Sequence, residues 1–335
     1  MSDTADNTAR HRLTSVRRWV IKVGSALLTN DGLGLDPLVM KTLTRQLASL
    51  HALGHEVVLV SSGAIAAGLV RLNLAERPRE IHLSQAAAAV GQSALVRAYE
   101  DCLGPHGVVT AQILLSHADV RARDRYLNAR STLNTLLGMG VLPIINENDT
   151  VVTDEIRLGD NDTLAALVAN LVDAEALLIL TDQDGLMDRD PRQDKDAKLI
   201  ASADVHDPDL DAIAGEGSAL GRGGMATKLS AARLAARSGT STIIANGRLP
   251  DVISKVVEGE LVGTFLHTNR QPLSARKQWL ASLLHAQGQL VLDEGAVTVV
   301  SDHGRSLLPI GITAVTGAFQ RGDLVSCVDA TGKER

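Results

Sequence analysis

The first segment with a chemical signature is Lys22-Val23-Gly24-Ser25, where a lysine and a glycine close an apolar run. A lysine inside an otherwise apolar strand is unfavourable unless its charge is paired or used. The neighbouring glycine lets backbone N–H groups approach an anion closely. A strand-end lysine that reaches solvent is the alternative, but the glycine favours an anion site made by Lys22, Gly24 and Ser25.

A second lysine ends the glycine-rich segment Gly221-Arg222-Gly223-Gly224-Met225-Ala226-Thr227-Lys228. A glycine-rich turn that runs into a helix offers an anion unpaired N–H groups and the positive end of the helix dipole. The spacing is not that of a Walker A loop, and no strand directly precedes it. A surface loop with an exposed Lys228 is the alternative to phosphate binding here.

Carboxylates and amides crowd the stretch from Asn146-Glu147-Asn148-Asp149 to Gly159-Asp160-Asn161-Asp162, with Asp154 and Glu155 between. Asp160 or Asn161 is well suited to cap the helix that follows. So many carboxylates beside a phosphate site would be repulsive unless a cation or an ammonium group binds there.

Short apolar runs alternate with longer helical patterns along most of the chain. The runs predict strands at residues 19–23, 56–60, 108–115, 141–145, 176–180 and 240–245, and helices at 38–53, 84–99, 119–137, 162–172 and 227–238. Strands separated by helices predict βαβ units and therefore an α/β fold, with an open, mostly parallel sheet sandwiched by helices. Pro143 favours an edge or an end of its strand.

Four of these strands end in polar or glycine-rich sequence. The ends are Gly24-Ser25, Ser61-Ser62-Gly63-Ala64, Asn146-Glu147-Asn148-Asp149 and Thr181-Asp182. Each could be a simple turn, but ligands of open parallel sheets bind outside the carboxyl ends of the strands. Their convergence on one edge therefore predicts the site.

The organisation of the chain changes near residue 268. We expect a disordered tail at 1–18, the α/β domain at 19–267, a linker at 268–276 and a small β module at 277–335, where close-set strands alternate with turn residues. With 335 residues, the chain exceeds the size at which single cores stop growing, about 250–300 residues.

Composition excludes several classes of protein. The net charge is −6, and residues 277–335 carry five Lys+Arg against six Asp+Glu, a net of −1, so we do not expect nucleic-acid binding. No apolar run approaches the roughly 20 residues that span a membrane. The two cysteines, Cys102 and Cys327, are far apart, which favours a reducing, cytoplasmic setting. Gly54 interrupts the pair His51 and His55, so no metal site is expected there.

Taken in order, these segments resemble the amino-acid kinase family, most closely its members that phosphorylate the side-chain carboxylate of glutamate. The matching stretches are Val20-Ile21-Lys22-Val23-Gly24-Ser25, Val60-Ser61-Ser62-Gly63-Ala64-Ile65-Ala66-Ala67-Gly68, Ala89-Val90-Gly91-Gln92-Ser93, Leu127-Asn128-Ala129-Arg130, Pro143-Ile144-Ile145-Asn146-Glu147-Asn148-Asp149, Gly159-Asp160-Asn161-Asp162, Thr181-Asp182-Gln183, Asp190-Pro191-Arg192 and Gly223-Gly224-Met225-Ala226-Thr227-Lys228. Family members for aspartate, acetylglutamate or uridylate share the lysine–glycine start but not the Asn-Glu-Asn-Asp and Gly-Asp-Asn-Asp pair.

The resemblance implies a role for each candidate residue. Lys22 and Lys228 contact the transferred phosphoryl group, Gly24 and Ser25 line the phosphate path, Ser62, Asp149 and Asn161 hold glutamate, and Thr181, Asp182 and the loop Gly223, Gly224, Met225, Ala226, Thr227 and Lys228 hold ATP. It also implies Mg²⁺ with the ATP, a first step of proline biosynthesis, inhibition by proline, and a homo-oligomer, either dimer or tetramer.

The C-terminal module resembles a PUA domain. The chain as a whole departs from the family pattern in three ways. Arg222 replaces an expected small or hydroxylic residue, and Met187 replaces an expected tyrosine on the adenine side. The chain stops at Arg335, so we expect an incomplete module. Two other functions stay open: a kinase of the same fold for another acid, and RNA binding through the PUA-like module.

Overall fold

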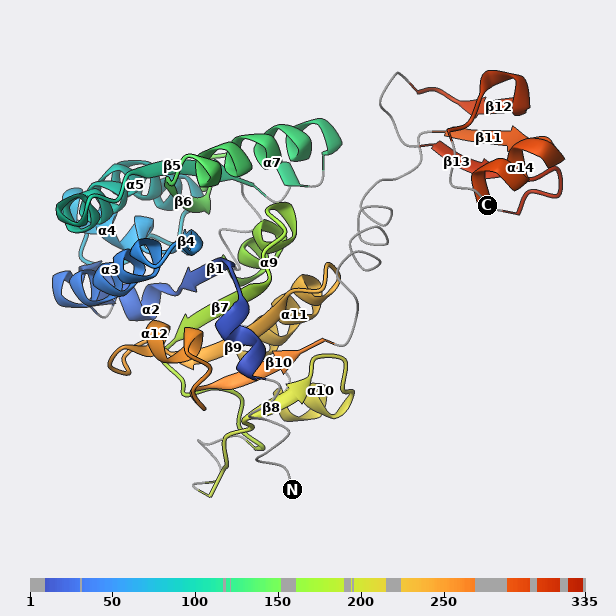
Figure 1. Cartoon of the computed structure of the whole chain (residues 1–335). Coiled ribbons are helices and arrows are strands. Elements are labelled where there is room, and N and C mark those ends of the chain that lie inside the picture. Colours follow the sequence, from blue (N-terminus) through green and yellow to red (C-terminus); the bar gives the residue numbers. More distant parts are fainter. Residues whose placement is uncertain are drawn as a thin grey trace. The chain divides into compact units, whose positions relative to one another are not determined.

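The structure is a computed structural model, and it describes residues 10–30, 32–116, 119–120, 122–151, 161–189, 194, 196–214, 224–268, 288–301, 306–319 and 325–333. The chain divides into two compact units, Met1–Lys277 and Gln278–Arg335 (Figure 1). Residues 269–276 of the expected linker lie outside the described residues.

An eight-stranded sheet forms the centre of the first unit, in the order β5-β6-β4-β1-β7-β9-β10-β8. Its strands are β5 (Thr110–Leu115), β6 (Leu142–Glu147), β4 (Glu56–Ser61), β1 (Arg18–Val23), β7 (Ala176–Thr181), β9 (Ser241–Asn246), β10 (Thr264–His267) and β8 (Ser202–Asp204). All neighbouring pairs are parallel except β9 and β10, which are antiparallel. The expected open, mostly parallel sheet is confirmed.

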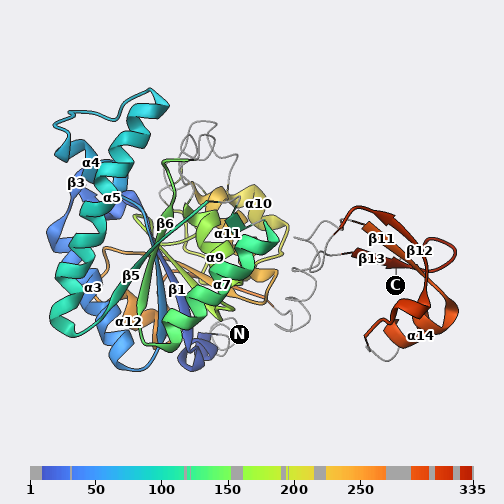
Figure 2. The ribbon, with the colours of Figure 1, turned by 90° about the horizontal axis from the view of Figure 1, so that it is seen from above.

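Helices cover both faces of this sheet (Figure 2). They are α2 (Ser25–Leu28), α3 (Pro37–Ala52), α4 (Ala64–Arg71), α5 (Ile81–Leu103), α7 (Arg123–Gly138), α9 (Asn161–Leu171), α10 (Asp209–Ala214), α11 (Met225–Ala236) and α12 (Val252–Val257), with 3₁₀ turns at His11–Ser15 and Gly104–His106 and a short ladder of β2 (Thr29–Asn30) and β3 (Leu33–Leu35). In Figure 2, α3 and α5 lie on one side of the sheet and α7, α9 and α11 on the other.

The central strands are apolar on both faces because both are covered by helices. In β1, Trp19, Val20 and Ile21 have no exposed surface. The interior position of β6, between β5 and β4, differs from the edge that Pro143 favours. Pro143 is tolerated because it is the second residue of the strand, and pairing with β4 begins only at Ile144.

The expected tail is wrong for residues 10–18. The guanidinium of Arg10 is fully buried and donates to the backbone oxygens of four residues, at 2.6 to 2.9 Å: Ala201, Glu260, Val262 and Gly263. Leu13 is only 1% exposed in the core. A charge can be buried when hydrogen bonds replace its contacts with water, and the bonds of both Nη atoms let this arginine fix the N-terminal segment. Residues 1–9 lie outside the described part of the chain.

The second unit contains a small sheet, as expected for the C-terminal module. Its elements are β11 (Gly288–Leu292), α14 (Glu294–Ser301), a 3₁₀ turn at Pro309–Gly311, β12 (Ile312–Gly317) and β13 (Val325–Val328). In the described part of this unit, β11 is the middle strand, antiparallel to β12 and parallel to β13.

Candidate active site

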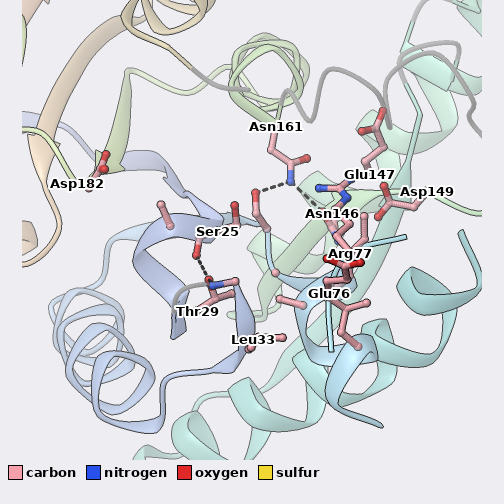
Figure 3. Close-up of a pocket in the computed structure, with 18 of the residues that line it drawn as sticks. Ser25, Thr29, Leu33, Glu76, Arg77, Asn146, Glu147, Asp149, Asn161 and Asp182 are labelled. Carbon is pink, nitrogen blue, oxygen red and sulfur yellow. Dashed lines mark hydrogen bonds between the residues drawn. The ribbon is translucent and has the colours of Figure 1, made fainter. Parts of the chain in front are cut away.

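A cavity of about 720 Å³ opens where β1, β4, β6 and β7 end (Figure 3). Six polar side chains that line it come from these strand ends and from the elements that follow them: Ser25, Ser62, Asn146, Asp149, Asn161 and Asp182. The polar strand ends therefore meet at one edge of the sheet, as the sequence predicts for parallel strands. A cavity of this size suits small-molecule ligands.

Beside the cavity, one carboxylate holds both candidate lysines. Lys22 Nζ lies 2.5 Å from Asp162 Oδ1, and Lys228 Nζ lies 3.2 Å from Asp162 Oδ2. The three side chains come from the end of β1, the first turn of α9 and the first turn of α11. Lys228 is only 5% exposed, so the alternative of a surface loop with an exposed lysine is wrong.

The ion pairs explain how these charges tolerate burial. Asp162 is 1% exposed, and burial alone would raise the pKa of its carboxyl; the positive charges of Lys22 and Lys228 outweigh burial and lower that pKa below its ordinary value. Asp162 therefore stays ionised and keeps two ammonium groups together. Asp162 was not among the predicted site residues, and the crowding of carboxylates in its segment is the only signal for it in the sequence.

A relay of amide groups reaches the cavity from α5. Asn146 Nδ2 donates to Gln92 Oε1 at 2.8 Å, and Asn161 Nδ2 donates to Asn146 Oδ1 at 3.0 Å and to Ser62 Oγ at 2.8 Å. Both N–H groups of Asn161 are used in this relay, whereas its Oδ1 is buried and has no partner among the described residues. Gln92 and Asn146 lie within matching stretches, but nothing in the sequence distinguishes them from their neighbours.

Asp149 lines the same cavity, near Arg77 of the connection between α4 and α5. Burial raises the pKa of the Asp149 carboxyl to about 6, although the charge of Arg77 opposes the rise. At neutral pH the carboxylate is therefore ionised and available to a cationic ligand group. Arg77 is a second residue that sequence reasoning missed, because its loop carries no motif.

Of the candidate nucleotide residues, Figure 3 labels Ser25 and Asp182, which lie away from Asp149 and Arg77. Thr181 Oγ1 donates to Asp182 Oδ1 at 3.0 Å, and Asp182 is exposed to the cavity. The Gly24 N–H donates to Leu180 O at 3.3 Å rather than pointing to a ligand. A Cβ on Gly24 would lie 3.5 Å from Lys22 Nζ, so this glycine leaves space beside the lysine.

The glycine-rich loop is described only from Gly224, which precedes α11 and so places Met225, Ala226, Thr227 and Lys228 in its first turn. Gly223, Arg222, Asp154, Glu155, Asp160 and the segment 190–192 lie outside the described residues. Met187 forms an isolated bridge with Leu199.

The described residues contain no group of three or more His, Cys, Asp or Glu side chains placed to hold a metal ion. None of their helices combines the length and apolar character needed to cross a membrane.

Known proteins match both units. The profile of the Amino acid kinase family matches residues 17–246, and that of the PUA domain matches residues 288–334. Glutamate 5-kinase of Saccharophagus degradans is 58% identical over 325 residues, which cover 97% of this chain and 87% of the relative. Glutamate 5-kinase of Pseudomonas aeruginosa is 58% identical over 326 residues, covering 97% of this chain and 88% of the relative.

The solved structures show the same fold at much lower identity. The UMP kinase from Bacillus anthracis has a TM-score of 0.52 and 17% identity, over 76% of this chain and 97% of its own. The UMP kinase from Ureaplasma parvum gives the same TM-score of 0.52. Family profile, relatives and fold agree: the chain belongs to the amino acid kinase family, in the group of the glutamate 5-kinases.

Proposed function

We propose that this protein transfers the γ-phosphoryl group of ATP to the side-chain carboxylate of L-glutamate, which forms L-glutamyl 5-phosphate, the first intermediate of proline biosynthesis. The observation that carries this proposal is the cluster of Lys22, Lys228 and Asp162, which lies beside a cavity lined by Asp149 and Asn161. The names of the relatives, at 57–58% identity, support the same reaction.

Charge is the main obstacle to this reaction. The side-chain carboxylate of glutamate is already ionised at pH 7, so the nucleophile needs no general base. An anion must however approach the anionic γ-phosphate, so catalysis depends on positioning and on stabilising charge. Lys22 and Lys228 supply two positive charges for the transferred phosphoryl group. Asp162 holds these charges in place, since each of its oxygens accepts one ammonium group.

The other end of the cavity suits the α-end of an amino acid. The ionised Asp149 is an acceptor for an ammonium group at this end of the cavity. Ser62 is fixed by its hydrogen bond from Asn161 and lines the same wall. The carboxylates that would repel phosphate therefore serve the substrate amine.

We assign ATP to the side of the cavity that contains Ser25, Asp182 and the start of α11. Mg²⁺ is bound mainly by nucleotide phosphates with one or two carboxylates, and it neutralises phosphate charge when present. Asp182 provides hard oxygen donors of this kind at the cavity wall. We further propose a cytoplasmic location, a homo-oligomer, either dimer or tetramer, and inhibition by proline.

A substrate screen tests the proposed reaction. Purified protein with Mg-ATP and L-glutamate should form ADP, and hydroxylamine should trap the acyl phosphate as the γ-hydroxamate. Aspartate should be a far poorer substrate, because it is one methylene too short to bring its carboxylate to the phosphate. N-acetylglutamate and UMP complete the screen, and equal turnover of any of these three would contradict the assignment to glutamate.

A further inference from the structure

The α-end of the cavity contains opposite charges side by side. Arg77 and Asp149 come from the α4–α5 connection and from the segment after β6, and both side chains line the cavity. In Figure 3 they lie with Glu76, Asn146 and Asn161 at one end, away from Asp182. The charge of Arg77 lowers the pKa of Asp149, so the two groups interact electrostatically across this end.

We propose that Arg77 binds the α-carboxylate of the amino-acid substrate, while Asp149 binds its α-ammonium group. This assignment rests on the proposed glutamate kinase activity and names the residue that recognises the second charge of the zwitterion. A guanidinium has the fork geometry that holds a carboxylate through two parallel hydrogen bonds.

The surroundings require such a cation. Glu76 and Glu147 line the same end of the cavity, and Asp149 is ionised at neutral pH, so an incoming α-carboxylate meets three carboxyl groups (Figure 3). Without Arg77, this repulsion would offset much of the attraction of the ammonium group. With both ends of the zwitterion fixed, the side chain of the substrate is directed along the cavity, away from Asp149 and toward the lysine cluster.

A simpler role for Arg77 is that of a counter-ion that keeps Asp149 ionised. The two roles predict opposite results with two truncated substrates used as competitive inhibitors. Glutarate has both carboxylates of glutamate but no amine, whereas 4-aminobutyrate has the amine but no α-carboxylate. If Arg77 binds the α-carboxylate, its loss weakens the binding of glutarate. If Arg77 is only a counter-ion of Asp149, its loss weakens the binding of 4-aminobutyrate alone.

The experiment measures the KM for L-glutamate and the two inhibition constants in the wild type, Arg77→Ala, Arg77→Lys and Arg79→Ala. Arg79 is the matched control, because it is exposed in the same loop and does not line the cavity. In Arg77→Ala, the KM for glutamate and the inhibition constant of glutarate should rise about 10- to 100-fold, the effect of one lost charge-assisted contact. The inhibition constant of 4-aminobutyrate and the KM for ATP should stay within about twofold of their wild-type values. In Arg77→Lys, the KM for glutamate and the inhibition constant of glutarate should lie between those of the wild type and Arg77→Ala.

The outcomes separate the two proposals. If Arg77→Ala weakens 4-aminobutyrate as much as glutamate and leaves glutarate unchanged, Arg77 serves Asp149 and the assignment is wrong. The assignment is also wrong if Arg77→Ala and Arg79→Ala have the same KM for glutamate. This comparison tests the assignment even if neither inhibitor binds the wild type. A wild type that forms no ADP with glutamate contradicts the proposed function itself, and the role of Arg77 fails with it.

Discussion

The two lysines of the site are held by a residue that does no chemistry itself. Asp162 accepts both ammonium groups and remains ionised because their charges outweigh its burial. Two like charges are therefore kept beside the cavity before any phosphate arrives. Such preorganised charge is the form of electrostatic stabilisation that needs no reorganisation during the reaction.

Replacing either lysine should therefore slow phosphoryl transfer. We expect Lys22→Ala and Lys228→Ala each to lower kcat by roughly 10²–10³-fold, as for the loss of one transition-state contact. Steady-state kinetics with glutamate and ATP measure the effect. Lys41→Ala, an exposed lysine on α3, is the control and should keep wild-type kcat. Wild-type kcat in a folded Lys22 or Lys228 variant would remove that lysine from the reaction.

Replacing Asp149 should change the KM for glutamate but not the KM for ATP. Asp149→Asn removes the negative charge that pairs with the substrate ammonium, so the KM for glutamate should rise about 10-fold or more, while the KM for ATP stays nearly unchanged. Asn161→Ala should act in the same direction. Initial rates at varied glutamate and at varied ATP give the two KM values. A larger change in the KM for ATP than in the KM for glutamate would mean that the glutamate and ATP subsites are assigned the wrong way round.

The raised pKa of Asp149 also makes stability depend on pH. Its folded value of about 6 lies above the ordinary 3.8, so the folded state binds this proton more tightly than the unfolded state. The resulting stability is present below pH 3.8 and is lost as pH rises through 6, by at most about 3 kcal/mol. Asp149→Asn should thus exceed the wild type in stability most at pH 8, and by only about half as much at pH 5, in urea unfolding. An equal difference at both pH values would contradict this.

At the scale of elements, α9 runs from the site to the opposite edge of the sheet, where β1 begins. Its N-terminal residues are Asn161 and Asp162, and nearly all of its side chains are buried. At its other end, Arg130 Nη1 donates to Leu171 O at 2.6 Å, and Arg18 Nη1 donates to Val172 O. These bonds satisfy carbonyl groups that a helix end leaves unpaired. The matching stretch that contains Arg130 thus has a structural role in fixing the helix.

The close contact between α4 and α5 explains why glycines stand at positions 68 and 91, in two of the matching stretches. A Cβ on Gly91 would lie 1.8 Å from Ala64 O, and one on Gly68 would lie 1.8 Å from Ala87 O. Only glycine allows these two helices to approach so closely. The contact supports the cavity wall, because Ala64 lines the cavity and Gln92 follows Gly91.

Gly91→Ala should therefore destabilise the protein by about 1–3 kcal/mol or more, the usual effect of overpacking, and raise the KM for glutamate. The control is Gly138→Ala at the end of α7, where an added Cβ meets nothing within 4 Å. Urea unfolding measures both variants. The control should be neutral or slightly stabilised. Equal stability of the two variants would show that the helices move apart without loss.

The whole molecule combines a kinase unit with a PUA unit, and the candidate catalytic residues all belong to the first. We expect a chain that ends at Thr268 to keep most of its glutamate-dependent ATP turnover, because the second unit supplies no candidate site residue. The kcat values of both chains are compared at equal folded fraction. A well-folded but inactive short chain would show that the PUA unit contributes to catalysis.

Much of the architecture follows from the sequence alone. Apolar runs such as 19–23 and 176–180 predicted strands, and their alternation with helical patterns predicted a parallel sheet, because each signal depends only on neighbouring residues. The edge at which Ser62, Asn146 and Asp182 meet was predicted too, since the strands of a parallel sheet all end on one side.

Only the tertiary structure decided which polar groups pair with each other. Asp162 between Lys22 and Lys228, the relay from Gln92 to Asn161, and Arg77 near Asp149 join residues from different elements. Arg10 likewise finds its carbonyl partners on segments near the other end of the unit. Spacing along the chain does not encode such contacts, because they depend on how the helices and loops pack on the sheet.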